Sequence, residues 1–326
     1  MVTTWRDLCS DAGRTLAGAG IGSAAVEARW MVEEVSGYDP AELVRGPAER
    51  PSDRAVARLA AMVDRRAAGE PLQYVLGHWA FRQLDLFVDP RVLIPRPETE
   101  VVAEVALEEA VRLGAKRGKR SSWAGTDTDY FVADLGTGSG ALALALVTEL
   151  PRAQVWATDV SEEALSVARA NFAGAGTAAA RVRIGTGSWF DALPVWLRGE
   201  LKLVVSNPPY VANSEIASLP PEIADYEPLD ALVSGPTGLE AVERVVAGAP
   251  EWLEASGAVV CEIAPHQAVD AVALALEAGY EEAFVRPDLT GRDRVLVARL
   301  RVGSTGWRTN STSTRCCNDS ATEPPR

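Results

Sequence analysis

The sequence contains Tyr130-Phe131-Val132-Ala133-Asp134-Leu135-Gly136-Thr137-Gly138-Ser139-Gly140, which indicates the fold class more strongly than any other segment. The first five residues of this segment have the apolar character of a short buried strand, and a glycine-rich turn follows. Residues 141–150 are helix formers, and Pro151 ends the run. A strand, a glycine turn and a helix N-terminus form a common cradle for nucleotide-containing ligands, because glycine lets the backbone approach the ligand closely. An ordinary tight connection has the same composition, so the stretch alone does not establish a ligand site.

The spacing of the glycines argues against a dinucleotide ligand. The third glycine comes one residue earlier than in the G-x-G-x-x-G pattern of NAD- and FAD-binding proteins. The next expected strand, residues 154–158, ends at Asp159, where a carboxylate can accept hydrogen bonds from the two hydroxyls of a ribose. Ser161 is the expected cap of the helix that follows. The order of these features favours a ligand that contains a nucleoside.

A second motif, Asn207-Pro208-Pro209-Tyr210, follows the apolar run Leu203-Val204-Val205-Ser206. Two consecutive prolines cannot continue a sheet ladder, so the chain must leave the sheet at the carboxyl end of this strand, where open α/β sheets bind ligands. The motif offers an amide oxygen, a carbonyl oxygen and an aromatic ring. Two acceptors and a ring can hold a planar NH2 group, which is what an enzyme that methylates amino groups requires. A proline-rich turn is the structural alternative, and it would be preferred for an isolated Pro-Pro pair.

The pattern along the whole chain predicts an α/β protein with a small helical domain in front. From about residue 97 strands alternate with helices, as in a doubly wound, Rossmann-like sheet. Further strands are expected at residues 181–184, 258–263, 282–285 and 294–300, which makes seven in total. We divide the chain into a helical domain at residues 1–75, a hairpin linker at 76–96, a catalytic domain at 97–301 and a disordered tail at 302–326. The helical domain has no catalytic constellation, so we interpret it as a docking module.

Composition limits the possible partners. The formal net charge is −13, and a protein that binds nucleic acid directly needs a basic face to neutralise phosphates. An acidic enzyme suits a basic protein substrate, although acidity also simply favours solubility. Cys9, Cys261, Cys316 and Cys317 have no metal-binding spacing, and the chain has only two histidines, so we expect no metal site. Without a membrane-spanning run or a leader, we expect a cytoplasmic monomer.

The two motifs resemble those of the protein-(glutamine-N5) methyltransferase family, which methylates class I peptide chain release factors. The resemblance covers most of residues 5–300. DNA amino-methyltransferases share the Asn-Pro-Pro-Tyr type of motif, but residues 94–100 are typical of this family and of its relatives that methylate ribosomal proteins. We expect Arg96 and Glu98 of that block to order the junction between the domains. Further matching blocks lie at residues 69–77, 92–93, 134–140, 227–228, 231–232 and 291–295.

The resemblance implies S-adenosylmethionine as methyl donor and the glutamine of a Gly-Gly-Gln segment as acceptor. Residue by residue, it implies that Gly136, Thr137, Gly138, Ser139, Gly140 and Asp159 hold the donor, with Trp189 close to its adenine and Asn207 beside it. Asn207, Pro208, Pro209 and Tyr210 would hold the glutamine, with Asn207, Pro208 and Tyr210 acting in catalysis. The chain departs from the family pattern in four places. Lys202 stands two positions before the apolar strand core, where the family usually has aspartate. The acidic residue often found before Trp189 is missing, Ala264 stands where glycine is usual, and residues 114–129 form a polar insertion.

Three functions remain open at this point. The first is glutamine methylation of a release factor. The second keeps the chemistry and changes the acceptor to a glutamine of a ribosomal protein or to the N6 amine of adenine in DNA. The third is a protein that binds the donor as a regulatory or assembly module without catalysis. The block at residues 94–100 and the negative charge argue against DNA, and the intact Asn207–Tyr210 motif argues against a module without catalysis.

Overall fold

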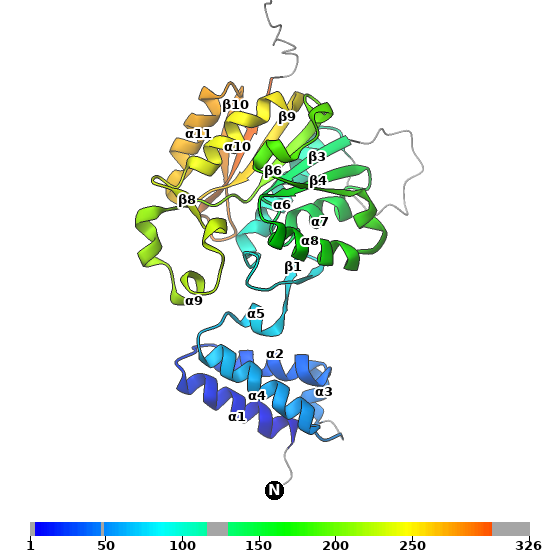
Figure 1. Cartoon of the computed structure of the whole chain (residues 1–326), viewed down its shortest axis with the longest axis vertical. Helices are drawn as coiled ribbons and strands as arrows, with labels where there is room; N and C mark the ends of the chain where they lie inside the picture. Colours follow the sequence, from blue (N-terminus) through cyan, green and yellow to red (C-terminus); the bar gives the residue numbers. More distant parts are fainter. Residues whose placement is uncertain (1–3, 47–48, 116–129, 302–326) are drawn as a thin grey trace, which may run out of the picture.

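The computed structural model describes residues 4–46, 49–115 and 130–301. The tail expected to be disordered at residues 302–326, with Cys316 and Cys317, lies outside the described residues. Nearly all of the polar insertion expected at residues 114–129 lies outside them too. Figure 1 shows a helical body joined to a larger α/β body through α5 and β1.

The first helices pack around a core of their own. They are α1 (Trp5–Gly18), α2 (Ala24–Ser36), α3 (Pro40–Arg45), α4 (Asp53–Ala67) and α5 (Leu72–Leu76). Leu16, Met31 and Leu59, from three different helices, are all at most 3% exposed in this core. The helices begin at caps that their sequence supplies, since the Thr4 hydroxyl accepts from the Asp7 N–H and the Ser52 hydroxyl accepts from the Ala55 N–H. The amphipathic spacing therefore produces a small bundle with one apolar interior.

A hairpin connects this bundle to the sheet. Its strands β1 (His78–Phe81) and β2 (Leu84–Phe87) are antiparallel. Phe81 and Leu86 are each 1% exposed and pack into the core of the larger body. The hairpin therefore belongs to that body by its packing. A helix, α6 (Pro97–Arg112), follows it and begins with a proline in its first turn.

The larger body is built on a seven-stranded sheet, which confirms the predicted fold class. The strand order is β10-β11-β9-β6-β3-β4-β5. All neighbouring strands are parallel except that β11 is antiparallel to both β9 and β10. The bounds are β3 (Tyr130–Leu135), β4 (Ala153–Asp159), β5 (Val182–Thr186), β6 (Leu201–Ser206), β9 (Leu253–Glu262), β10 (Glu282–Pro287) and β11 (Asp293–Arg299).

Helices cover both faces of this sheet. One face packs against α6, α7 (Ala141–Glu149) and α8 (Glu162–Gly174), and the other packs against α10 (Glu240–Gly248) and α11 (Ala268–Glu277). Adjacent residues of β3 show the alternation, because Val132 joins the first core and Ala133 joins the second. A sheet covered on both faces explains why its strands read as continuous apolar runs.

The segment after residue 210 was not predicted from the sequence. It contains β7 (Val211–Ala212), which pairs in parallel with β8 (Val233–Gly235), and α9 (Pro221–Ala224) lies between them. This segment reaches the helical body, since Arg66 Nη1 lies 3.3 Å from Glu222 Oε2 and the Tyr226 hydroxyl donates to the Ala68 carbonyl at 3.1 Å. The short 3₁₀ helices are η2 (Gly176–Arg181), η3 (Trp189–Ala192), η4 (Val195–Leu197), η5 (Asn213–Ser218), η6 (Leu229–Ala231), η7 (Ala249–Glu251) and η8 (Pro265–Gln267).

Candidate active site

The glycine turn lies between the end of β3 and the first residue of α7. Its conformation requires glycine, because φ is +54° at Gly138 and +84° at Gly140. A Cβ atom on Gly140 would lie 2.5 Å from Phe172 Cε1, whereas a Cβ atom on Gly138 would have no heavy atom within 4 Å. Gly140 thus allows close packing against α8, and Gly138 borders open space of the kind that a bound ligand needs.

Asp159 holds this turn from the end of β4. Its Oδ2 accepts from the Gly138 N–H and its Oδ1 accepts from the Ser161 N–H, both at 2.9 Å. Burial raises the pKa of Asp159, and the backbone N–H donors oppose that rise. Each carboxylate oxygen has a second lone pair, so the group can hold the turn and still accept from a ligand. Its role as ribose acceptor stays a prediction.

Asp134 is a buried carboxylate that the sequence analysis did not assign to the site. Its Oδ2 accepts from the Thr137 hydroxyl at 2.6 Å and from the Ala143 N–H at 3.0 Å. Its Oδ1 is buried and has no hydrogen-bond partner among the described residues. Burial raises the pKa of Asp134 to about 7. An acidic residue that ends an apolar strand just before a glycine turn was the signal available in the sequence.

Trp189 lies beside the same turn. The position of a Cβ atom on Gly136 is 3.9 Å from Trp189 Cζ3. Trp189 has φ of +48°, which is unusual for an aromatic residue, and its side chain is half-buried. The structure therefore brings Trp189, Asp159 and the glycine turn together, while a contact with adenine remains a prediction.

Asn207 is held by one end of its amide. The chain leaves the sheet directly after β6, where the Ser206 hydroxyl donates to the Leu135 carbonyl at 2.6 Å. Asn207 Nδ2 donates to Thr99 Oγ1 at 3.1 Å. Asn207 Oδ1 is buried and has no hydrogen-bond partner among the described residues. A buried acceptor without a donor is costly, so this oxygen has the chemistry of a site for an incoming N–H group.

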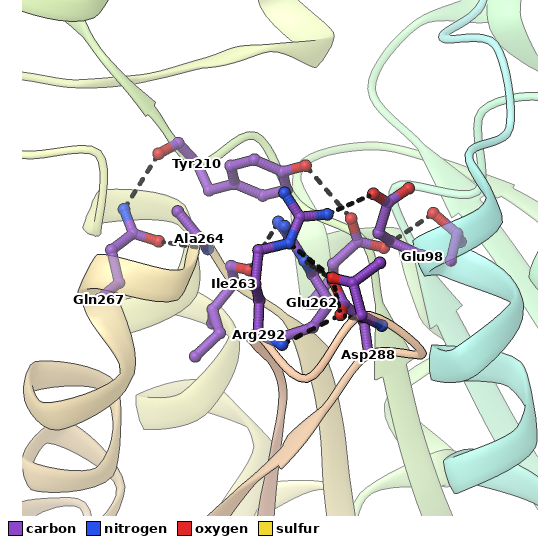
Figure 2. Close-up of polar contacts among 11 residues, drawn as sticks. Glu98, Tyr210, Glu262, Ile263, Ala264, Gln267, Asp288 and Arg292 are labelled. Atoms are coloured by element: carbon purple, nitrogen blue, oxygen red, sulfur yellow. Dashed lines mark hydrogen bonds and ion pairs between the residues drawn. The ribbon is translucent and has the colours of Figure 1, made fainter.

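Two residues from other elements complete this arrangement, and sequence reasoning did not single them out. The Thr99 hydroxyl, in the first turn of α6, donates to Glu262 Oε2 at 2.8 Å. The Tyr210 hydroxyl donates to Glu262 Oε1 at 3.2 Å, as Figure 2 shows. Thr99 belongs to the block at residues 94–100, and Glu262 is the last residue of β9. The carboxylate thus connects that block to the Asn207–Tyr210 motif.

Tyr210 is fixed at its backbone as well. Gln267 Nε2 donates to the Tyr210 carbonyl at 3.0 Å, and Gln267 Oε1 accepts from the Ala264 N–H (Figure 2). Gln267 Nε2 also donates to the Gly238 carbonyl at 3.0 Å. A Cβ atom on Gly238 would lie 2.7 Å from the Tyr210 carbonyl oxygen, so glycine permits this close approach. Pro208 is buried and Pro209 is half-buried within the motif.

The block at residues 94–100 is tied to the segment after the motif by Glu227. This carboxylate is 5% exposed, accepts from the Ile94 N–H at 3.1 Å and forms an ion pair with Arg96. Arg96 therefore pairs with Glu227, and Glu98 instead lies 3.2 Å from Arg292 (Figure 2). The buried ion pair joins two distant parts of the chain around the site, since 131 positions separate the two residues.

The described residues contain neither a metal-binding cluster nor a membrane-spanning helix. Residues 4–46, 49–115 and 130–301 contain no group of three or more His, Cys, Asp or Glu side chains arranged to hold a metal ion. Within the same ranges, no helix is both long and apolar enough to cross a membrane.

Two family models match parts of this chain, and curated proteins match most of it. The family model of the PrmC N-terminal domain matches residues 7–77, and that of the methyltransferase small domain matches residues 125–220. The release factor glutamine methyltransferase of Deinococcus radiodurans is 41% identical over 299 residues, which are 91% of this chain and 99% of that protein. The enzyme of the same name from Moorella thermoacetica is 39% identical over 300 residues, which are 91% of this chain and 99% of that protein.

A solved structure of a release factor-specific protein-(glutamine-N5) methyltransferase from Alicyclobacillus acidocaldarius is 26% identical. The match covers 66% of this chain and 98% of that one, with a TM-score of 0.38. The assignment therefore depends on the sequence relatives, which match this chain over nearly their whole length. On their identity and coverage, the chain belongs to the release factor glutamine methyltransferase family.

Proposed function

We propose that this protein methylates the side-chain amide nitrogen of the glutamine in the Gly-Gly-Gln segment of class I peptide chain release factors, with S-adenosylmethionine as donor. The observation that carries the proposal is the buried, unpartnered Oδ1 of Asn207 at the carboxyl end of β6. An amide NH2 group is a donor that this oxygen can accept, and relatives of this chain bear the name release factor glutamine methyltransferase.

The donor site in this proposal is the cradle at the ends of β3 and β4. Its residues are Gly136, Thr137, Gly138, Ser139, Gly140, Asp159, Trp189 and Asn207. Asp134 is added because its unpartnered Oδ1 suits a cationic donor group such as an ammonium. When bound, S-adenosylmethionine supplies a methyl group that its sulfonium has already activated. No metal is part of the proposal.

The acceptor site is the Asn207–Tyr210 motif. An amide nitrogen is a poor nucleophile, because its lone pair is delocalised into the neighbouring carbonyl. Hydrogen bonds from the two N–H groups to Asn207 Oδ1 and to the Pro208 carbonyl would raise the electron density on nitrogen and fix its direction. Tyr210 would pack against the plane of the amide. Orientation of this kind contributes up to about 7–11 kcal/mol in favourable cases.

The helical body at residues 1–75 is the proposed docking surface for the release factor. It lies against the segment that follows the Asn207–Tyr210 motif, through Arg66 and Glu222 and through Tyr226 and Ala68. The net charge of −13 favours a basic protein substrate over direct contact with nucleic acid. We further propose that the enzyme is a cytoplasmic monomer without a membrane partner.

Methyl transfer from radiolabelled donor tests the acceptor. We expect label in a class I release factor and none in the same factor after its Gly-Gly-Gln glutamine is changed to alanine. Ribosomal proteins and duplex DNA serve as the alternative acceptors and should remain unlabelled. Label that persists in the altered factor, or that enters DNA, would contradict the proposal. A protein that only bound the donor would label nothing.

A further inference from the structure

A buried chain of polar groups runs from Asn207 to a carboxylate outside its motif. Asn207 Nδ2 donates to Thr99 Oγ1 at 3.1 Å, and the Thr99 hydroxyl donates to Glu262 Oε2 at 2.8 Å. Thr99 is 4% exposed and Glu262 is fully buried. Neither residue lies in the glycine turn or in the Asn207–Tyr210 motif, so neither has a part in the proposed grip on donor or glutamine.

The direction of hydrogen bonding in this chain follows from chemistry. An ionised carboxylate only accepts, so the single hydroxyl hydrogen of Thr99 must point at Glu262. The lone pairs of Thr99 Oγ1 then face Asn207, which must present its NH2 end to them. The two ends of an asparagine amide have the same shape, and only the hydrogen-bond network distinguishes them. Asn207 Oδ1 is thereby left for the substrate.

We infer that Thr99 and Glu262 are positioning residues, which act through Asn207 to keep its amide oxygen directed at the acceptor nitrogen. The inference rests on the role proposed above for Asn207. A reversed amide would oppose its own NH2 group to the NH2 group of the glutamine, and two donors cannot bond. The same carboxylate accepts from the Tyr210 hydroxyl at 3.2 Å, so one group orders both ends of the motif.

The groups around Glu262 give it a pKa within the pH range in which enzyme activity can be measured. Burial raises the pKa of Glu262 to about 7, with opposing contributions from the Thr99 hydroxyl, Arg294 of β11 and the Tyr210 hydroxyl. Glu98 of α6 raises the pKa further, and Cys261, the neighbour on β9, is buried. Each oxygen of the carboxylate accepts from one hydroxyl, so protonation of either oxygen sets an O–H donor against a hydroxyl donor. The ordered state therefore exists above about pH 7 and is lost as the pH falls through that value.

Substitutions at Thr99 separate positioning from structure. Thr99→Val keeps the shape and removes the acceptor, whereas Thr99→Ser keeps the hydroxyl. We expect Thr99→Val to lower kcat about 10- to 100-fold with donor affinity close to that of the wild type, and Thr99→Ser to stay within about threefold of the wild type. Tyr280→Phe is the matched control, because it removes a buried hydroxyl whose bond to the Val246 carbonyl lies away from the site. It should lower stability and leave kcat unchanged.

The pH profile of Glu262→Gln is an independent test that does not depend on the Thr99 variants. Wild-type kcat should fall below about pH 7, and the variant should have a lower kcat without that fall. A Thr99→Val enzyme with wild-type kcat, equal losses in Thr99→Val and Thr99→Ser, or an unchanged acid limb in Glu262→Gln would overturn the inference. Asn207→Ala distinguishes a failure of the proposed role of Asn207 from a failure of the inference about Thr99 and Glu262. If it keeps turnover, the proposed role of Asn207 fails as well; if it is inactive while Thr99→Val is fully active, only the inference fails.

Discussion

Asp159 holds the glycine turn through the Gly138 N–H, and we propose that it also binds the donor. In Asp159→Ala the Gly138 N–H loses its acceptor, and in the proposed site the two ribose hydroxyls lose theirs as well. Each lost hydrogen bond to a charged group costs about 1.5–3 kcal/mol, so donor affinity should fall at least about tenfold. Titration calorimetry measures this, with Glu163→Ala as the control that removes the same charge from an exposed position on α8. Equal donor affinities for the two variants would refute the assignment.

Two glycines of one turn should respond differently to alanine. At Gly140 the added methyl group meets Phe172 at 2.5 Å, so we expect Gly140→Ala to destabilise the fold by about 1–3 kcal/mol. At Gly138 the methyl group meets no heavy atom within 4 Å, and it would project into the proposed donor site. In Gly138→Ala the loss in the free energy of donor binding should therefore exceed the loss in the free energy of unfolding. Denaturant unfolding measures the stability of both variants, and calorimetry measures their donor affinity. If the loss of stability and the loss of donor affinity stood in the same ratio in both variants, the prediction would be contradicted.

The residues of the site differ in how well the sequence could predict them. Asn207–Tyr210 and Gly136–Gly140 are contiguous, and their order along the chain already implies strand ends with special turns. Thr99 and Glu262 are 163 positions apart, and nothing local to either suggests that they touch. Their meeting depends on how α6 packs beside β9. The orientation of Asn207 is a property of that packing and could not be read from its motif.

Among the elements, six of the seven strands lie within two residues of the predicted bounds, whereas β9 begins five residues earlier, at Leu253. Continuous apolar runs identify strands covered on both faces, and that pattern is local. The antiparallel direction of β11 cannot be predicted from the local sequence, because it depends on which strands it pairs with. The segment from Val211 to Gly235 escaped prediction for a similar reason: its strands are three residues long at most, too short for a periodic pattern.

Arg82 links the hairpin to α6 and α7. This residue has φ of +55° in the turn, and its side chain bonds to Glu104 at 2.8 Å and to Glu149 at 2.7 Å. We expect Arg82→Ala to lower the free energy of unfolding by about 1–3 kcal/mol, because these partly buried charged bonds are lost. Arg198→Ala breaks an exposed pair with Glu251 and should cost less than about 1 kcal/mol. Denaturant titration compares the two; a smaller loss at Arg82 would count against this account of the hairpin.

The molecule consists of two bodies with cores of their own, and Tyr74 of α5 packs into the core of the larger body. The helical body touches the segment after the Asn207–Tyr210 motif through Arg66 and Tyr226. It touches the hairpin through His78 and through an edge-to-face contact between Trp30 and Trp79. Sequence periodicity predicted both bodies, because each core is built from local amphipathic patterns. It did not predict how they contact each other, since that depends on single side chains from distant positions.

His78 makes one of these contacts sensitive to pH. Its Nδ1 lies 2.7 Å from Asp85 Oδ1 on β2 and its Nε2 lies 3.2 Å from Glu34 Oε2 on α2. A protonated ring donates to both carboxylates, whereas a neutral ring has one N–H. Burial lowers the pKa of His78, but the hydrogen bonds and charges of Asp85 and Glu34 outweigh it, so the net pKa is raised. The stabilisation is therefore fully present below the unfolded-state pKa of about 6.5 and is lost as the pH rises through the folded-state value.

We expect wild-type protein to be more stable than His78→Gln at about pH 5.5, with the difference shrinking toward about pH 8.5. Because the imidazole is 42% exposed, solvent screens the pair and added salt should reduce the difference further. His266→Gln is the control, since His266 Nε2 lies 3.9 Å from Glu215 and makes no link to the helical body. Denaturant unfolding across this pH range measures the effect. A difference at His78 that grows as the pH rises would reverse the sign of the linkage and exclude a protonated bridge between the two bodies.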